Sequence, residues 1–185
     1  MESPGEMFDT PSLRARAAGF TLIELMVTIS VAATLLAIGV PMFRDTIARS
    51  RLTEQSNDLV GAITLARSQA ITANQSVSFC RANSAAAVAC SAVDAPWQFW
   101  IVRNSAGTVI RRGTISTHGG AIVVSSTLAN HRVTFASDGL ARTNGALVAG
   151  EQIVVCSNHS TTDNQRQITL GAGSRVSTDR ASGGC

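Results

Sequence analysis

The stretch GFTLIELMVTISVAATLLAIGV, from Gly19 to Val40, decides how this chain is organised. Residues 20–40 contain one charged side chain, the carboxylate of Glu24. An α-helix rises about 1.5 Å per residue, so this segment would be about 30 Å long and would match the hydrocarbon core of a bilayer. The segment therefore predicts a membrane-spanning helix. Because a charge is costly in lipid, the acidic group inside it predicts a functional residue.

An ordinary signal peptide is one alternative for this stretch. It would have a shorter apolar core and a small-x-small cleavage site after that core, whereas here a glycine and polar residues precede the apolar run. Arg14 and Arg16 lie just before the run and favour a cytoplasmic N-terminus, although three nearby acidic residues reduce the positive charge. A plain single-pass anchor for an external domain is the second alternative, if the leader is never removed.

The residues Gly19-Phe20-Thr21-Leu22-Ile23-Glu24 resemble the prepilin motif of type IV pilins and of type II secretion pseudopilins. The resemblance implies that a prepilin peptidase cuts after Gly19, so that residues 1–19 are a leader, and N-methylates Phe20. It also implies that Glu24 pairs with a free N-terminal amine during filament assembly. The implied partners are the inner membrane and other minor pilins or pseudopilins, and the implied location is the inner membrane and then the pilus.

Pro41 marks the next boundary. It cannot donate a backbone hydrogen bond to Ala37, and its ring crowds that carbonyl, so we expect a kink or a melted turn near residues 38–41. The predicted parts are a transmembrane and assembly half of the helix at 20–41, an amphipathic half at 42–73, and a periplasmic β-rich domain at 74–185. Small and apolar side chains at helical spacing predict the face of the amphipathic half that packs on its own sheet: Ala48, Leu52, Leu59, Ile63, Ala66 and Ala70.

From residue 76 the apolar pattern changes to a period of two, which is typical of strands. A long helix followed by hairpins predicts an α+β fold of the type IV pilin kind, with the helix packed on an antiparallel β domain. Trp97 and Trp100 fall on opposite faces of one strand, which predicts one core residue and one surface or interface residue. The expected strands are 77–80, 97–102, 108–111, 121–126, 132–136, 152–157, 166–170 and 175–178, with turns at 104–107, 137–139, 143–145 and 171–173.

Several of these strands resemble those of the GspH/FimT group of minor pilins and pseudopilins. Residues 97–107 resemble its hairpin, residues 133–139 its F-x-x-x-G strand and turn, and residues 153–156 and 166–170 its closing strands. Resemblance to the FimU-like branch implies a structural minor pilin near the filament tip that helps to prime or cap the pilus, with a role in twitching motility. A GspH pseudopilin of type II secretion is the alternative in the same class.

Four cysteines lie in the part that we place outside the cytoplasm, and an even number there indicates disulfides. Three pairings are possible. We favour Cys80–Cys90, which closes a short Ala-rich loop, and Cys156–Cys185, which ties down the C-terminus. Zinc binding is the rival hypothesis, and the absence of a C-x-x-C pair argues against it.

All 15 basic residues of the chain are arginines. Residues 20–185 hold 13 Arg and 9 acidic residues, so the formal charge is 13 minus 9, or +4, which is too small to indicate nucleic acid by itself. Some members of the FimT branch are implied to bind DNA during natural transformation, through a C-terminal G-R-x-R pattern, so a DNA-binding minor pilin for natural transformation is the alternative in a different class. The corresponding stretch, residues 171–180, departs from it, since Ser177 replaces the second arginine. A solvated loop is the favoured interpretation, and the candidate DNA contacts are Arg166, Arg175 and Arg180.

The sequence lacks the patterns of the common catalytic sites. It has no G-x-S-x-G nucleophile elbow and no H-E-x-x-H pair, and its three histidines are scattered. No Gly-rich phosphate loop precedes a helix, and no tight cluster of acidic residues is present. We therefore predict a structural protein that is not an enzyme and has no cofactor and no metal.

Overall fold

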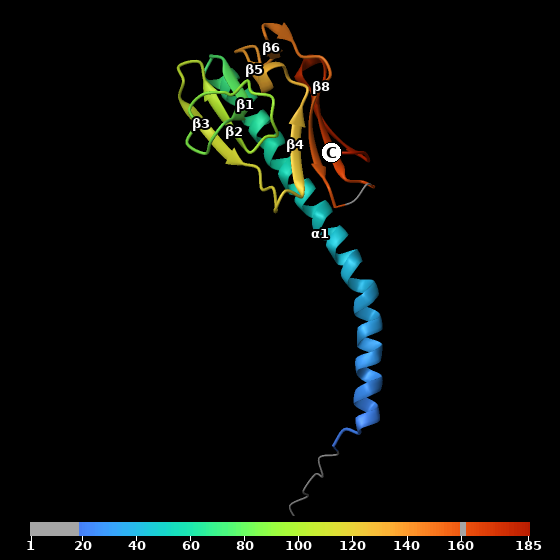
Figure 1. Ribbon diagram of the computed structural model, residues 1–185. Coiled ribbons are helices and arrows are strands. Elements are labelled where there is room, and N and C mark those ends of the chain that lie inside the picture. The colour runs from blue at the N-terminus through green and yellow to red at the C-terminus, as the bar shows by residue number, and fades with distance from the viewer. Residues whose placement is uncertain (1–18, 160–161) are drawn as a thin grey trace, which may run out of the picture. The chain divides into compact units, whose positions relative to one another are not determined.

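The computed structural model describes residues 19–159 and 162–185. The predicted leader, apart from Gly19, lies outside these residues. The chain divides into two compact units, Met1–Pro41 and Met42–Cys185, and one helix, α1 (Leu22–Thr72), contributes to both (Figure 1).

Helix α1 continues through Pro41. The backbone of residues 38–41 is helical, so the expectation of a melted turn at this point is wrong. A proline removes one backbone hydrogen bond from the helix, and the intact bonds on either side suffice to carry the helix past it. The boundary between the two compact units nevertheless falls directly after this residue.

The end of α1 follows from Asn74. This residue has a φ of 48°, in the left-handed region that asparagine tolerates. The N–H of Gln75 donates to the carbonyl of Ala70 at 3.2 Å, which is the six-to-one bond that closes a Schellman motif. The chain then turns directly into the first strand.

The second half of α1 packs its small and apolar stripe against the sheets. All six positions predicted from their spacing are buried, which confirms the amphipathic assignment: Ala48, Leu52, Leu59, Ile63, Ala66 and Ala70. Leu59, Ala62 and Ile63 join buried residues of both sheets in one core. The stripe therefore gives the domain its central element.

In the described residues, ten strands form two antiparallel sheets (Figure 1). The six-stranded sheet has the order β3-β2-β1-β5-β6-β7, and the four-stranded sheet has the order β10-β9-β8-β4. The first five strands are β1 (Val77–Ala82), β2 (Phe99–Asn104), β3 (Val109–Thr114), β4 (Ile122–Ser126) and β5 (Arg132–Phe135). The others are β6 (Ala141–Thr143), β7 (Ala146–Leu147), β8 (Glu151–Ser157), β9 (Gln165–Leu170) and β10 (Val176–Ala181), with short 3-10 helices at Ala129–His131 and Ala172–Ser174.

The strand predictions agree with this arrangement within a few residues at each end, and the α+β class is confirmed. The two strands that the sequence did not predict, β6 and β7, are 3 and 2 residues long. Such short strands contain too few residues for an alternating pattern to appear. β6 ends at Thr143 and β7 begins at Ala146, so the turn predicted at residues 143–145 connects them.

The prediction that one tryptophan is exposed is wrong, because both Trp97 and Trp100 are buried. Trp97 precedes β2, so the alternation of a strand does not apply to it. Its backbone N–H donates to the carbonyl of Val124 on β4 at 2.9 Å. Both indole rings pack on Phe79 of β1, with centroids 5.6 and 5.7 Å away, and form one aromatic cluster in the core.

The turn after β5 explains the F-x-x-x-G pattern. Phe135 is fully buried, and Gly139 has a φ of 74°. A Cβ atom at Gly139 would lie 2.8 Å from Cδ1 of Ile71 on α1. The glycine is thus required both by the backbone conformation and by the close approach of the helix.

Candidate functional site

The first candidate site is the start of α1. Gly19, Phe20 and Thr21 precede the helix, and the side chain of Phe20 is 84% exposed. The N–H of Glu24 donates to Oγ1 of Thr21 at 3.3 Å. Thr21 is therefore the N-cap and Glu24 the third helical residue, where a carboxylate suits the positive end of the helix dipole. The T-x-x-E pattern was readable in the sequence, but its role as a cap was not recognised there.

Hydroxyl groups in the apolar part of α1 are satisfied inside the helix. Thr28 donates to the carbonyl of Leu25, Ser30 to that of Met26 and Thr34 to that of Ser30, over 2.8 to 2.9 Å. In an apolar surrounding such groups need an internal partner. The carboxylate of Glu24 differs from them, because it forms no hydrogen bond or ion pair within the described part of the chain.

The apolar side chains of this segment are left uncovered by the chain itself. Leu22, Leu35 and Ile38, for example, are 63 to 76% exposed. Among the described residues, α1 is the one helix whose length and composition would allow it to cross a membrane, with an 18-residue window of mean hydropathy 2.2 that is 0% buried. This segment needs an apolar surrounding that the rest of the chain does not supply.

The two cysteine pairs favoured from the sequence are the disulfides that the structure contains. Cys80–Cys90 joins β1 to the loop before β2, across a sequence separation of 10 residues. Cys156–Cys185 joins β8 to the C-terminal residue, across a separation of 29. Each bridge fastens a segment that lies outside the sheets to one of their strands.

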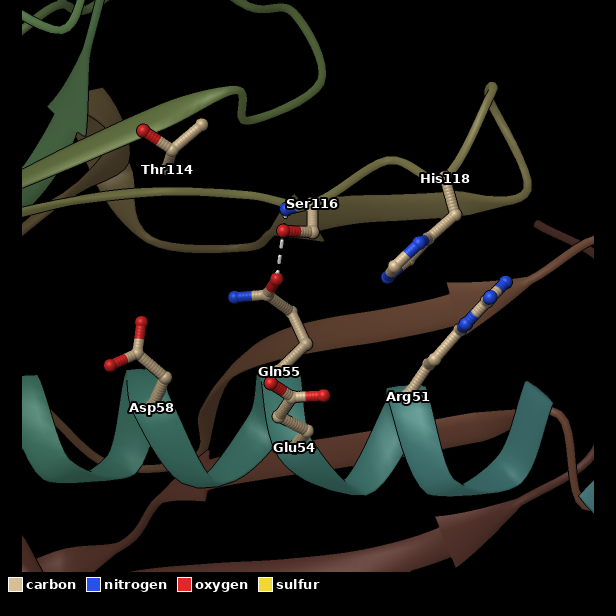
Figure 2. Close-up of a pocket in the computed structure, with 7 residues that line it drawn as sticks. All are labelled: Arg51, Glu54, Gln55, Asp58, Thr114, Ser116 and His118. Atoms are coloured by element: carbon tan, nitrogen blue, oxygen red, sulfur yellow. Dashed lines mark hydrogen bonds between the residues drawn. The ribbon is translucent and has the colours of Figure 1, made fainter. Parts of the chain in front are cut away.

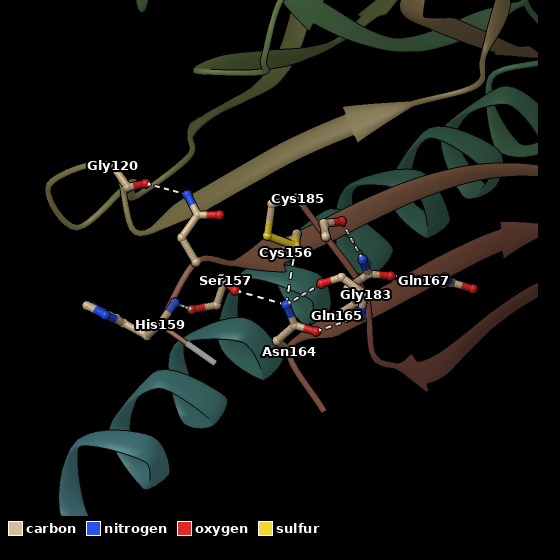
Figure 3. Close-up of a disulfide and its surroundings, with 11 residues drawn as sticks. Gly120, Cys156, Ser157, His159, Asn164, Gln165, Gln167, Gly183 and Cys185 are labelled. Atoms are coloured by element: carbon tan, nitrogen blue, oxygen red, sulfur yellow. Dashed lines mark hydrogen bonds between the residues drawn. A yellow bond between two sulfur atoms is a disulfide. The ribbon is translucent and has the colours of Figure 1, made fainter. Parts of the chain in front are cut away.

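The C-terminal tail is held by more than its disulfide (Figure 3). Asn164 is buried, and its side-chain amide donates to the carbonyls of Ser157 at 3.1 Å and of Gly183 at 2.8 Å. Its amide oxygen accepts from the N–H of Gly183 at 3.0 Å. Gln165 donates to the carbonyl of Gly184 at 2.9 Å. Neither residue could be identified from the sequence, because nothing in its local pattern points to a tail 19 residues further along the chain.

The three candidate DNA contacts do not share one environment. Arg166 is buried and donates to Oδ1 of Asp163 at 2.9 Å, so its charge is neutralised by the fold. Arg180 is exposed and lies 3.9 Å from the other oxygen of Asp163. Arg175 is exposed at the start of β10. The structure thus makes Arg166 a structural residue, and a cluster of all three arginines on the surface is not formed. DNA binding through Arg175 and Arg180 stays a prediction.

A polar pocket of about 220 Å³ lies between α1 and the segment that follows β3 (Figure 2). Gln55 of α1 accepts a hydrogen bond from the N–H of Ser116 at 3.0 Å. Asp58 forms an ion pair of 2.8 Å with Arg111, whose guanidinium also lies over the ring of Trp100. These contacts fasten the β3 segment to the helix. Within the described residues, no group of three His, Cys, Asp or Glu side chains could hold a metal ion.

Comparison with protein-family models identifies two matching regions. Residues 14–40 match the prokaryotic N-terminal methylation motif, and residues 55–174, more than half of the chain, match the type II transport protein GspH. The chain belongs to the GspH family. This family contains minor pilins and pseudopilins, which confirms the resemblance inferred from Gly19–Glu24 and from the β strands. A search of curated proteins found no significant sequence match.

Three solved structures are similar to this GspH-family chain. One crystal form of the type IV minor pilin FimU of Pseudomonas aeruginosa superimposes with a TM-score of 0.51, at 17% identity, over 71% of this chain and 90% of that one. A second crystal form gives 0.49, at 18% identity, over 69% and 92%. The minor pseudopilin EpsH from the type 2 secretion system of Vibrio cholerae also gives 0.49, at 8% identity, over 70% and 97%. The superposition with the first FimU crystal form supports a pilin-like fold.

Proposed function

We propose that this protein is a minor pilin of a type IV pilus, a structural subunit that helps to prime or cap filament assembly. The observation that carries the proposal is the first unit of the chain. In residues 22–40 of this unit the apolar side chains are uncovered, the hydroxyls are satisfied internally, and the single carboxylate, on Glu24, has no partner in the described residues. Such a segment suits a bilayer before assembly and a bundle of neighbouring helices after it.

In this proposal a prepilin peptidase removes residues 1–19 and methylates Phe20. The match of residues 14–40 to the N-terminal methylation motif supports both steps. The new amine at Phe20 then pairs with Glu24 of a neighbouring subunit, because a carboxylate among apolar helices requires a charged or hydrogen-bonding partner. The β domain lies in the periplasm, a placement supported by the two disulfides and by Arg14 and Arg16 before the span.

The test is the amount of Glu24→Ala protein in sheared filaments, compared with the wild type and with Glu54→Ala. Glu54 is an exposed acid on the second half of α1, so the control removes the same group from the same helix. We expect Glu24→Ala to be lost from the filament fraction, while its amount in the membrane and its disulfides are unchanged. Normal incorporation of Glu24→Ala would refute the role of this residue. Intact-mass analysis that finds residues 1–19 retained, or an unmethylated Phe20, would refute the processing step.

A GspH-type pseudopilin of type II secretion is the second candidate, and the family match over residues 55–174 favours it. The two candidates differ in the assembly that fails when the chain is deleted. Loss of surface pili with normal export of secreted proteins supports the minor pilin. Loss of export with normal pili supports the pseudopilin and would overturn our first choice.

A further inference from the structure

The outer face of the six-stranded sheet carries a second pocket, of about 200 Å³. Val77 and Phe79 of β1 point into the core, so Ser78 and Cys80, which alternate with them, point to the opposite face. The pocket is lined by Ser78, Cys90, Arg103, Asn104, Ser105 and Arg132.

The strand register brings two arginines to this pocket from either side of β1. Ser78 is paired with Arg103 on β2, and Cys80 is paired with Arg132 on β5. Neighbouring strands lie about 4.8 Å apart and residues rise about 3.4 Å along a strand, so the two arginines, two spacings and two residues apart, start about 12 Å from each other with β1 between them. Long side chains that line one pocket from these positions can both reach a single small group.

These two guanidinium groups lack the carboxylate partners that some other arginines have. Within the described residues, neither the Arg103 nor the Arg132 guanidinium forms a hydrogen bond or an ion pair, whereas those of Arg111, Arg142 and Arg166 each pair with an aspartate at 2.7 to 2.9 Å. Two unpaired cations at one pocket repel each other, and an anion bound between them would remove this repulsion.

Neutral hydrogen-bond donors also line the pocket. The side-chain oxygen of Asn104 accepts from the N–H of Thr108 at 2.8 Å, which leaves its amide nitrogen to donate elsewhere. The Ser105 hydroxyl adds a further donor to the lining. Cys90 is bonded to Cys80 of β1, so the wall of the pocket on that side is fixed covalently. The combination of guanidinium, amide and hydroxyl donors is one that recognises an oxyanion.

We propose that the Arg103–Arg132 pocket binds a carboxylate side chain of a neighbouring protein subunit. A guanidinium matches a carboxylate with two parallel hydrogen bonds, and the pocket is of a size for one acidic side chain. A nucleic acid is less well suited, because its backbone calls for a longer row of cations and its bases for aromatic rings, and the lining holds two cations and no ring. The choice of a filament subunit as the partner rests on the proposed function.

The test uses the full chain in detergent micelles and titrates it, at low salt, with a short peptide that contains two adjacent glutamates. The same peptide with glutamines, inorganic phosphate and a DNA oligonucleotide are titrated in parallel. We expect the glutamate peptide to bind and to shift the backbone amide signals of Ser78, Asn104 and Ser105. Arg103→Gln and Arg132→Gln should each weaken binding about tenfold, the loss expected for one charge-assisted hydrogen bond.

Two further variants serve as controls. Arg103→Lys keeps the charge but loses the fork of donors, so it should weaken binding less than Arg103→Gln. Arg49→Gln removes an exposed arginine of α1 and should leave binding unchanged. Competition of phosphate with the peptide supports the shared oxyanion chemistry.

Three results would overturn the proposal: no binding of the glutamate peptide, binding that the arginine variants do not alter, or binding of phosphate or DNA without binding of the peptide. Because the titration requires no filament, its failure is distinguishable from a failure of the Glu24 experiment.

Discussion

The two halves of α1 differ in apolar content and in surroundings. In residues 22–40 every side chain is exposed, whereas in residues 43–72 a stripe of small and apolar side chains is buried under two sheets. The first half is apolar on all sides, with Leu22, Ile23, Leu25, Met26 and Val27 in one run. A helix that is apolar on all sides needs lipid or other helices, whereas one with a single stripe needs one partner face.

This difference separates folding from assembly along one continuous helix. Substitutions in the second half should change the stability of the β domain and leave the first half able to enter a membrane. Substitutions in the first half should change anchoring and filament formation and leave the β domain folded.

Truncation of matched isoleucines gives the largest contrast. Ile63 is fully buried and Ile38 is 63% exposed, on the same helix. Ile63→Ala should destabilise the β domain by about 2–5 kcal/mol, through lost burial and the cavity that remains, and Ile38→Ala should have almost no effect. Chemical unfolding of the full chain in detergent, followed by the fluorescence of Trp97 and Trp100, measures both. Equal destabilisation by the two variants would contradict the division of α1.

The two disulfides should stabilise the β domain unequally. Replacing either pair by serines should cost about 3 kcal/mol, and the loss should be about 1 kcal/mol greater for Cys156–Cys185, because it closes the longer loop in the unfolded chain. The sequence separations are 29 and 10 residues. Unfolding midpoints of the two double variants, under identical conditions, provide the comparison. The reverse order would contradict the explanation from loop length.

Substitution of two glycines with positive φ distinguishes the cost of backbone strain from the cost of packing against α1. Gly145→Ala meets open space at a φ of 84° and should cost about 1–2 kcal/mol from the left-handed conformation alone. Gly139→Ala has a similar φ of 74° but also meets Ile71 at 2.8 Å, so about 1–3 kcal/mol of overpacking should be added. The difference between the two unfolding free energies measures the contact with the helix. Gly139→Ala with Ile71→Ala should recover most of that difference.

The smallest expected effect concerns acid stability. The hydrogen bonds from Arg142, at 2.7 and 3.0 Å, and then that from the N–H of Leu140 lower the pKa of Asp138 to about 2. Because the folded pKa lies below the unfolded value of about 3.9, the stabilisation is present above pH 4 and is lost as the pH falls toward 2. Asp138→Asn should therefore lower the melting temperature slightly at pH 7 and not at pH 2.

The matched control is Asp179→Asn, which removes an exposed carboxylate of β10 that forms no ion pair within the described residues. Its melting temperature should follow that of the wild type at both pH values. A pH-independent difference between Asp138→Asn and the wild type would contradict the role of the Arg142 hydrogen bonds.

Local patterns in the sequence determined the parts of this protein whose causes are local. The apolar run before Pro41, the stripe from Ala48 to Ala70 and the alternation in the longer strands each depend on side chains a few residues apart. Periodicity therefore predicted the helix, most of the strands and the α+β class. The even number of cysteines indicated two disulfides, and loop length favoured the correct partners.

The tertiary structure decided what depends on residues far apart in the chain. Strand pairing and core packing bury Arg166 and both tryptophans, and they attach the tail to Asn164. Strand pairing also places Arg103 and Arg132 at one pocket. A periodic pattern states which face of a strand is apolar, but it does not state which strand lies beside it. Side chains acquire their partners, and so their chemistry, only when that pairing is made.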